Sequence, residues 1–268
     1  MSSFQLTSAI RYDPLYAQPS PFFLLPNHFD RLRTAAALHG WQDTLTSLSW
    51  SSFQSTCNCA VQEYDGPAKG GPLKVRSLVY PFIYSFLILF LQLRLVLHRA
   101  GTITVTITPV SPLTADPMLA AHISPSTDYL HPSLGDPIAL FLDKSATPSS
   151  LFTSTKTTNR GHYQAARARF GLPDAGGPAD VILWNTNGMI TETSVRNLAF
   201  FRHCRWVTPH DSTGCLPGVM RRQLLEQGLV LTDDRGLLSR DNVRDGELVI
   251  VFNAVEGCRI AVAHVRMV

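Results

Sequence analysis

Four short segments of the sequence carry side chains that could act together in one chemical site. The amine of Lys156 stands in STKTTNRGHYQAARARFG, just before a predicted helix, and the carboxylate of Glu192 follows the turn in ILWNTNGMITETSVRNLAFFR. In TGCLPGVMRRQLLEQG, Gly218 opens a predicted helix, and a helix N-terminus offers N–H groups and partial positive charge to an anion such as phosphate. The cation of Arg31 lies in NHFDRLRTAAALHGW. Taken singly, each residue is ordinary, since most lysines, glutamates and arginines are solvated surface residues.

Other kinds of catalytic or metal site find little support. The nine histidines include neither HxH nor HExxH, and no G-x-S-x-G is present to form a hydrolase elbow. Cys57 and Cys59 are separated by one residue, and no His or Cys pair follows at zinc-finger spacing. The sequence therefore predicts no metal site.

The composition is that of a globular protein. Among 268 residues, 45% are hydrophobic and 16% are charged, which suits a chain with a sizeable core. The net charge is only +3 and the Lys and Arg residues are scattered, so a nucleic-acid partner is not expected. Five cysteines without framework spacing, and an N-terminus without a signal-peptide pattern, predict a reduced protein of the cytoplasm.

The first half predicts a strand, a helix and a hairpin. Residues 4–10 form a short apolar strand, and Asn27 caps a helix over residues 28–39 that Gly40 ends. On both sides of a turn at residues 99–101, apolar residues alternate with Arg and Thr. This period of two indicates a β-hairpin.

Residues 77–92, SLVYPFIYSFLILFLQ, interrupt this pattern. With the flank to Leu97 the run approaches the ~20 residues of a membrane span, but it contains Pro81 and polar residues and is flanked by charges. A membrane is therefore not expected. Without the run, Arg76 joins Leu93 and the alternation of the hairpin arm continues. We interpret residues 77–92 as an insert, with translated intron sequence as the hypothesis and a buried helix as the alternative.

The second half predicts short strands separated by few helices, which is typical of an α+β domain with a sheet or barrel. Helices are expected over residues 163–170 and 219–227, and the closing strands over residues 248–253 and 260–265. Residues 143–150, DKSATPSS, have the composition of a linker. We therefore expect a small N-terminal domain of residues 1–146 and a larger C-terminal domain of residues 147–268.

Taken together and in this order, the four segments resemble the class IV aminotransferase family, the pyridoxal-phosphate enzymes of fold type IV. The resemblance covers about residues 4–45 and 97–265, and PGVMRRQLLEQG and KTTNR are most similar to the aminodeoxychorismate lyase-like members. It implies a two-domain α+β fold that binds pyridoxal 5′-phosphate between the domains, and a homodimer.

The resemblance assigns a role to each segment. Pyridoxal phosphate requires an amine for a Schiff base, a carboxylate at its pyridine nitrogen and a cup for its phosphate. Lys156 matches the Schiff-base lysine, the catalytic residue, and Glu192 matches the glutamate at the pyridine nitrogen. The other cofactor-binding residues that the resemblance implies are Arg31, matching the phosphate-binding arginine, and Asn197, Gly218, Val219, Met220 and Asn253.

Two residue positions and one structural element depart from the family pattern. Some members have Thr where Met220 stands, so a backbone donor is kept here but a hydroxyl is lost. Ala254, next to Asn253, also lacks the hydroxyl that many members place on the phosphate. The usual first hairpin before Phe4 is missing.

The activity that the resemblance implies is that of a lyase of folate synthesis, which forms 4-aminobenzoate and pyruvate from the small amino substrate aminodeoxychorismate. Lys156, released when the substrate amine takes its place, would remove the proton from the amine-bearing carbon. A class IV aminotransferase acting on branched-chain or D-amino acids shares the same residues and stays open. An inactive or membrane-associated protein is the alternative of another class, if residues 77–92 disturb the small domain.

Overall fold

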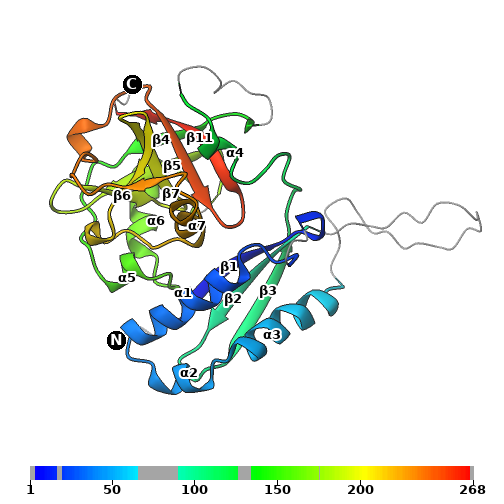
Figure 1. Ribbon diagram of the computed structural model, residues 1–268. Coiled ribbons are helices and arrows are strands. Elements are labelled where there is room, and N and C mark those ends of the chain that lie inside the picture. Colours follow the sequence, from blue (N-terminus) through cyan, green and yellow to red (C-terminus); the bar gives the residue numbers. More distant parts are fainter. Residues whose placement is uncertain (1–3, 17–19, 66–89, 126–133, 175, 266–268) are drawn as a thin grey trace, which may run out of the picture.

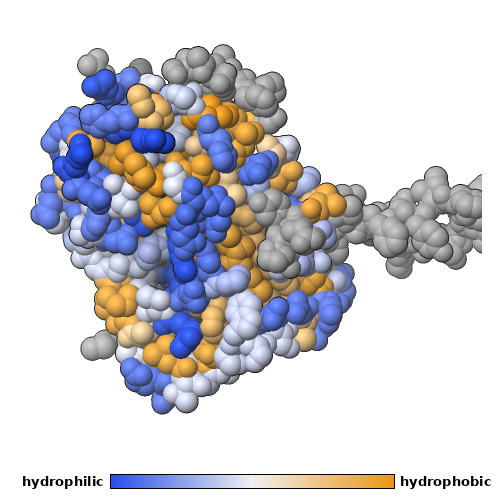
Figure 2. Space-filling view, in the orientation of Figure 1, coloured by the Kyte–Doolittle hydropathy of each residue, from blue (hydrophilic) through white to orange (hydrophobic). Residues whose placement is uncertain are grey.

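The computed structural model describes residues 4–16, 20–65, 90–125, 134–174 and 176–265. These residues form two parts, a smaller one around a three-stranded sheet and a larger one around an eight-stranded sheet (Figure 1). On the face in Figure 2, polar residues form a band over the junction between the parts. Within the described residues, no helix is both long and apolar enough to cross a membrane.

The smaller part is an antiparallel sheet in the order β1-β2-β3, with one face covered by helices. Its elements are β1 (Leu6–Tyr12), α1 (Leu25–Leu38), α2 (Gln42–Ser47), α3 (Trp50–Gln62), β2 (Leu91–Leu97) and β3 (Ile103–Pro109). Alternate leucines of β2 are fully buried against apolar residues of α1 and α3. The opposite face carries polar side chains, including Arg94 of β2 and Thr106 of β3, which are paired in register.

The β2–β3 hairpin confirms the alternation predicted around residues 99–101, since Leu97 pairs with Ile103 across the turn. Leu91 and Gln92, the last two residues of the interpreted insert, belong to β2. Leu91 is fully buried and pairs with Tyr12 of β1, so the strand extends further than the alternation alone indicated. Residues 77–89 lie outside the described residues, so the intron hypothesis stays a prediction.

Helix α1 begins earlier than predicted. Leu24, with φ of 55°, occupies the N-cap position, and Pro26 lies in the first turn, where its fixed φ suits a helix. Asn27 therefore lies inside the helix and does not cap it. The end agrees with the prediction, since the helix stops at Leu38 and Gly40 adopts a φ of +67° that favours glycine.

The larger part is a mixed sheet in the order β6-β5-β4-β11-β10-β7-β8-β9, which curls on itself (Figure 1). Its strands are β4 (Ile138–Leu142), β5 (Ala179–Trp184), β6 (Ile190–Thr193), β7 (Asn197–Arg202), β8 (Arg205–Thr208), β9 (Leu231–Thr232), β10 (Leu248–Asn253) and β11 (Gly257–His264). Its helices are α4 (Leu119–His122), α5 (Leu151–Ser154), α6 (Gly161–Ala168) and α7 (Val219–Glu226).

The curled sheet is apolar on both faces. Alternate residues such as Leu198 and Phe200 of β7 pack with side chains of β4, β5, β10 and β11 inside the curl. The residues between them, such as Ala199, pack against α7. Another part of the outer face, Val181 and Leu183 of β5, packs against α6. Burial on both faces explains why these strands read as apolar runs rather than as alternation.

The predicted boundary between residues 146 and 147 stays a prediction. Strand β4 precedes that boundary, yet it pairs in parallel with both β5 and β11 in the eight-stranded sheet. The hydrogen bonds therefore connect residues 138–142 to the larger part of the structure.

Candidate active site

Lys156 lies where the two parts of the molecule meet. Its segment, between α5 and α6, runs along the free edge of β1, where Leu6 and Thr157 form an antiparallel bridge. The backbone N–H of Thr7 donates to the Lys156 carbonyl over 2.8 Å, and that of Thr158 donates to Gln5 over 2.9 Å. The smaller sheet therefore holds the backbone of the predicted catalytic lysine directly.

The surroundings of Lys156 favour its neutral amine. Burial, followed by the charges of Arg31 and Arg160, lowers the pKa of Lys156 to about 7, and the charge of Glu192 opposes this shift. Arg94, on the polar face of the smaller sheet, adds a weaker push in the same direction as the other arginines. A lysine with a pKa near neutrality can act as a nucleophile and as a base, which a solvated lysine does poorly.

Glu192, in β6, is a deeply buried carboxyl group with 4% of its surface exposed. Its Oε1 accepts a hydrogen bond of 2.6 Å from the Tyr163 hydroxyl and a weaker one of 3.4 Å from the backbone N–H of Leu216. Burial raises the pKa of Glu192 to about 7, although the Tyr163 hydrogen bond and the charge of Lys156 act in the opposite direction. Lys156 and Glu192 thus act on each other electrostatically, each opposing the pKa shift that burial gives the other.

Arg31, on α1, keeps unused hydrogen-bonding capacity. Its Nη2 donates to the Ser8 hydroxyl of β1 over 2.7 Å, and this hydroxyl lies 2.8 Å from Nδ1 of His28. In the contact between Ser8 and His28, which group donates is set by the tautomer of His28. The buried Nε of Arg31 and Nε2 of His28 have no partner among the described residues. Unpaired buried donors are rare in folded proteins, so this corner of the structure suits an anion.

The start of α7 is shaped by a close approach between Gly218 and Asn197. The Asn197 amide donates to the Leu216 carbonyl over 2.8 Å, and a Cβ on Gly218 would lie 1.9 Å from Asn197 Oδ1. Only glycine fits this position. Met220 packs its side chain into the core, so Val219 and Met220 offer only backbone N–H groups, which the first turn of a helix leaves without helical partners.

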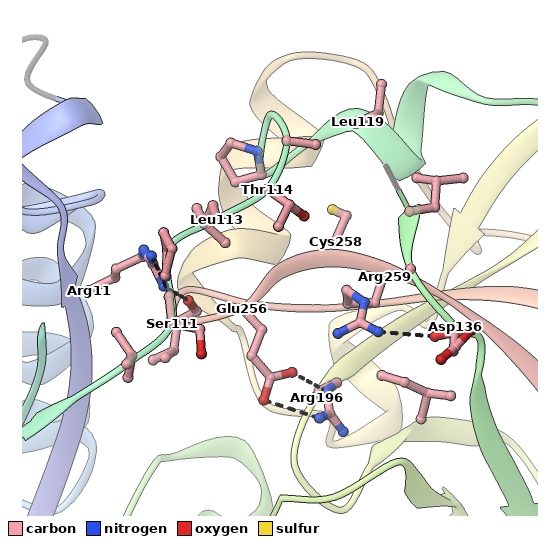
Figure 3. Close-up of a pocket in the computed structure, with 18 of the residues that line it drawn as sticks. Arg11, Ser111, Leu113, Thr114, Leu119, Asp136, Arg196, Glu256, Cys258 and Arg259 are labelled. Carbon is pink, nitrogen blue, oxygen red and sulfur yellow. Dashed lines mark hydrogen bonds and ion pairs between the residues drawn. The ribbon is translucent and has the colours of Figure 1, made fainter. Parts of the chain in front are cut away.

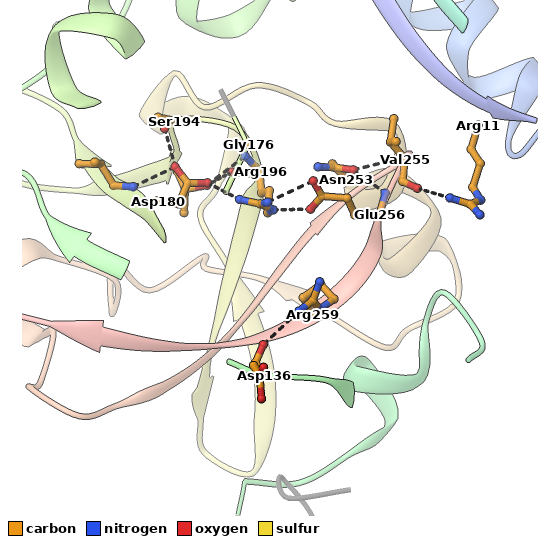
Figure 4. Close-up of polar contacts among 12 residues, drawn as sticks. Arg11, Asp136, Gly176, Asp180, Ser194, Arg196, Asn253, Val255, Glu256 and Arg259 are labelled. Carbon is orange, nitrogen blue, oxygen red and sulfur yellow. Dashed lines mark hydrogen bonds and ion pairs between the residues drawn. The ribbon is translucent and has the colours of Figure 1, made fainter. Parts of the chain in front are cut away.

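Asn253 uses its side-chain oxygen within its own turn. It ends β10, and its Oδ1 accepts hydrogen bonds of 2.9 Å from the N–H groups of Val255 and Glu256 in the turn to β11. Arg11 of β1 donates to the Val255 carbonyl over 3.2 Å, which joins this turn to the smaller part (Figure 4). The structure therefore shows Asn253 as a residue that shapes a turn between the two parts.

Four of the eight predicted site residues line two cavities that share Thr155. One, of about 20 Å³, is lined by residues including Lys156 and Glu192, and the other, of about 310 Å³, by residues including Arg31 and Val219. The amine and the carboxylate thus meet in one cavity, and the arginine and the α7 start meet in the next. A larger cavity, of about 670 Å³, lies beside the β10–β11 turn and is lined by none of the predicted site residues (Figure 3).

Sequence reasoning missed several contacts of this site. Arg160 and Tyr163 stand in the same segment as Lys156, so their closeness along the chain was a usable signal. Ser8 and Arg94 had no such signal, because the fold brings them to the site from distant strands.

Comparison with known proteins places this arrangement in a family. The family model for amino-transferase class IV matches residues 14–263. A Schizosaccharomyces pombe protein provisionally named an aminodeoxychorismate lyase is 31% identical over 234 residues, which cover 87% of this chain and 80% of that protein. The aminodeoxychorismate lyase of Saccharomyces cerevisiae is 33% identical over 125 residues, which cover 41% of this chain and 33% of that protein.

A solved structure from Mesorhizobium loti, provisionally named an amino-acid aminotransferase, superposes with a TM-score of 0.66 at 23% identity, over 97% of this chain and 99% of that one. The fold is therefore that of the pyridoxal-phosphate enzymes of fold type IV, as the resemblance implied. The chain belongs to the class IV aminotransferase family, and it is accordingly a pyridoxal-phosphate-dependent enzyme.

Proposed function

We propose that this chain is the lyase that converts aminodeoxychorismate into 4-aminobenzoate and pyruvate. The observation that carries the proposal is the pairing of Lys156 and Glu192 in one cavity, with the pKa of each close to 7. The substrate follows from the two fungal relatives named as aminodeoxychorismate lyases. Solved aminotransferase structures that are less than 25% identical to this chain share its fold as well. The fold alone therefore does not choose between the lyase and the aminotransferase reaction.

The donor set of the site fits pyridoxal phosphate. Lys156 supplies the amine, and Glu192 keeps one carboxylate oxygen, Oε2, without a donor among the described residues. Arg31 has a buried, unpaired Nε, and the start of α7 adds backbone N–H groups for a phosphate. The residues proposed to bind the cofactor are Arg31, Lys156, Glu192, Val219 and Met220. Asn197 and Gly218 shape the turn before α7, and Asn253 shapes the β10–β11 turn.

Lys156 performs the proton transfers in this proposal. When bound, the cofactor supplies an electron sink that Glu192 maintains by keeping the ring nitrogen protonated. Lys156 would take the proton from the amine-bearing carbon of the substrate, and its pKa of about 7 suits a base at neutral pH. Loss of the enolpyruvyl group leaves the aromatic ring, and Lys156 gives a proton to the pyruvate methylene.

Product analysis tests the proposal against the aminotransferase alternative. The protein with pyridoxal phosphate is mixed with aminodeoxychorismate, and separately with branched-chain and D-amino acids. A lyase releases 4-aminobenzoate and leaves the cofactor in its aldehyde form, whereas an aminotransferase converts the cofactor to its amine form. Lys156→Ala is expected to abolish the reaction, and Lys144→Ala, a lysine next to Phe170 on another surface, to leave it unchanged. Transamination without 4-aminobenzoate would overturn the proposal.

We further propose a cytoplasmic homodimer with no nucleic-acid or membrane partner. The five cysteines are all free, which suits a reducing compartment. The dimer follows from the family resemblance, and light scattering of the purified protein tests it. Recovery of the chain only in detergent would instead favour the membrane-associated alternative that residues 77–92 raise.

A further inference from the structure

The two carboxylate oxygens of Glu192 have different surroundings. Oε1 accepts from both the Tyr163 hydroxyl, at 2.6 Å, and the Leu216 N–H, at 3.4 Å. No described residue donates to Oε2, and Oε2 is not among the fully buried atoms that lack a partner. Glu192 also lines the cavity that it shares with Lys156. One oxygen is therefore held by the protein, and the other is left for a ligand.

Tyr163 is itself held rigidly. Its ring packs in the core between α6 and β5, with Ala166, Val181 and Leu183. On the other side the Arg160 guanidinium carbon lies 4.8 Å from the ring centre, and Nη2 of Arg160 donates to the Ser194 carbonyl over 2.9 Å. Because the ring is confined in this way, the position of its hydroxyl oxygen is fixed. The hydrogen bond from this hydroxyl therefore selects one orientation of the Glu192 carboxylate.

We propose that Tyr163 is a positioning residue, which holds Oε1 of Glu192 so that Oε2 binds the ring nitrogen of pyridoxal phosphate. The inference rests on the proposed function, and it gives a role to a residue of the Lys156 segment that the resemblance left without one. Tyr163 acts through Glu192, since among the described residues its hydroxyl bonds to that carboxylate alone.

Tyr163 also stabilises the charged form of Glu192. Its hydroxyl donates to the carboxylate, and this bond lowers the pKa of Glu192 against the larger effect of burial. The other titratable or charged groups near Glu192 are Lys156 and Arg160, which lower its pKa, and Cys215, in the loop before α7, whose own thiol pKa is raised in part by the charge of Glu192. Loss of the hydroxyl therefore raises the pKa of Glu192 while these groups stay in place.

The first test uses the protein without cofactor and needs no activity. Unfolding is measured between pH 4.5 and 9 for wild type, Tyr163→Phe, Glu192→Gln and the double variant. Because the native pKa of Glu192 is raised, the native state holds its proton longer than the unfolded state, and stability falls as pH rises from about 4.5 to about 7. In Tyr163→Phe this fall is expected to continue above pH 7, and in the Glu192→Gln background the pH dependence of the Tyr163 effect is expected to vanish.

Thr191→Val is the matched control for this experiment. Thr191 is also buried and stands next to Glu192, but its hydroxyl donates to the Leu183 carbonyl over 3.3 Å and does not touch the carboxylate. It is expected to lower stability equally at every pH. The same pH-independent loss in Tyr163→Phe, unchanged by Glu192→Gln, would mean that Tyr163 has only a structural role and would overturn the proposal.

The second test measures the dissociation constant of pyridoxal phosphate by fluorescence titration. Tyr163→Phe is expected to weaken binding roughly tenfold, the usual effect of losing a hydrogen bond to a charged group, and Thr191→Val to leave it unchanged. In the Glu192→Gln background, Tyr163→Phe should have little further effect. If wild type fails to bind the cofactor, the proposed function and this inference fall together. If wild type binds and Tyr163→Phe binds equally well at every pH, only the inference on Tyr163 is wrong.

Discussion

Two buried ionic clusters lie close together on strands β5, β6 and β7, and they differ in how fully their groups are paired. The first surrounds Asp180, whose side chain is completely buried. Its carboxylate accepts from Arg167 over 3.2 Å, from Arg196 over 2.9 Å and from Thr193 over 2.8 Å, and it also bonds the Ser194 hydroxyl (Figure 4). Each oxygen of Asp180 therefore has several donors.

The charged groups of the Asp180 cluster are paired with one another. Arg196 forms a two-pronged pair with Glu256, at 2.6 and 3.1 Å, so the cluster links β5 and the β6–β7 turn to the β10–β11 turn. The cluster around Lys156 and Glu192 is different, because Arg31, His28 and Glu192 each keep an atom without a partner among the described residues. We infer that the saturated cluster holds the loop after Glu192 in place, and that the unsaturated one is kept ready for a ligand.

The largest expected effect comes from breaking the saturated cluster. Asp180→Ala leaves Arg167 and Arg196 buried without their common partner and is expected to cost about 3–5 kcal/mol of unfolding free energy. Asp241→Ala, which removes an exposed ion pair with Arg240, is expected to cost less than about 1 kcal/mol. Urea unfolding of both variants measures the difference. Equal small losses would mean that the Asp180 cluster does not hold the structure together.

In the unsaturated cluster, removing the carboxylate should raise the unfolding free energy rather than lower it. Glu192→Gln removes a carboxylate whose native pKa of about 7 lies above its usual 4.5, and it is expected to stabilise the cofactor-free protein by about 3 kcal/mol at pH 8. The gain should disappear below pH 4.5, where the carboxyl group is protonated in both states. A loss of stability at pH 8 would place Glu192 with the structural residues and contradict the comparison.

A smaller effect is expected at the turn that connects the two clusters. Gly218→Ala drives a Cβ onto Asn197 Oδ1, and overpacking of this kind costs about 1–3 kcal/mol. Binding of pyridoxal phosphate should weaken more than binding of pyridoxal, since only the former has a phosphate for the α7 start. Gly161→Ala is the control, because nothing lies within 4 Å of its added Cβ. Equal weakening for both ligands would argue against a phosphate at α7.

The smallest effect is electrostatic. Arg94 lowers the pKa of Lys156 less than Arg31 and Arg160 do, so Arg94→Gln should raise that pKa slightly. The pH dependence of Lys156 labelling by pyridoxal phosphate and borohydride should move to higher pH, with stability nearly unchanged. Arg31→Gln should move it further. A shift to lower pH in Arg94→Gln would show that Arg94 does not act on the lysine through its charge.

The sequence predicted those features whose signal is local. The β2–β3 hairpin follows from alternation, and the start of α7 follows from Pro217 and Gly218. Helix α3 was not predicted, because only Phe53 and Cys57 of its thirteen residues are buried and their spacing gives a weak pattern. Leu24 was missed as the cap of α1 because a leucine with positive φ has no sequence signature.

The sequence predicted the site residues that lie in the four motifs, but not the contacts that the fold makes between distant segments. The fold brings Lys156 and Glu192 to one cavity, and their roles at the cofactor stay a prediction. The contacts of Ser8 with Arg31 and of Tyr163 with Glu192 join residues 23 and 29 positions apart, and only the folded chain brings them together. The expected place of Asn253 at the phosphate stays a prediction, and the structure shows its Oδ1 accepting from its own turn.

Trapping of the cofactor on its lysine tests the central claim most directly. The purified protein is mixed with pyridoxal phosphate, its visible spectrum is recorded before and after borohydride, and the labelled peptide is found by mass spectrometry. The chain has only four lysines, Lys69, Lys74, Lys144 and Lys156, so the label can be assigned without ambiguity. We expect a visible band that borohydride removes and a label on Lys156. In Lys156→Ala we expect neither the band nor a labelled peptide. A folded protein without the band, or a label on another lysine, would contradict it.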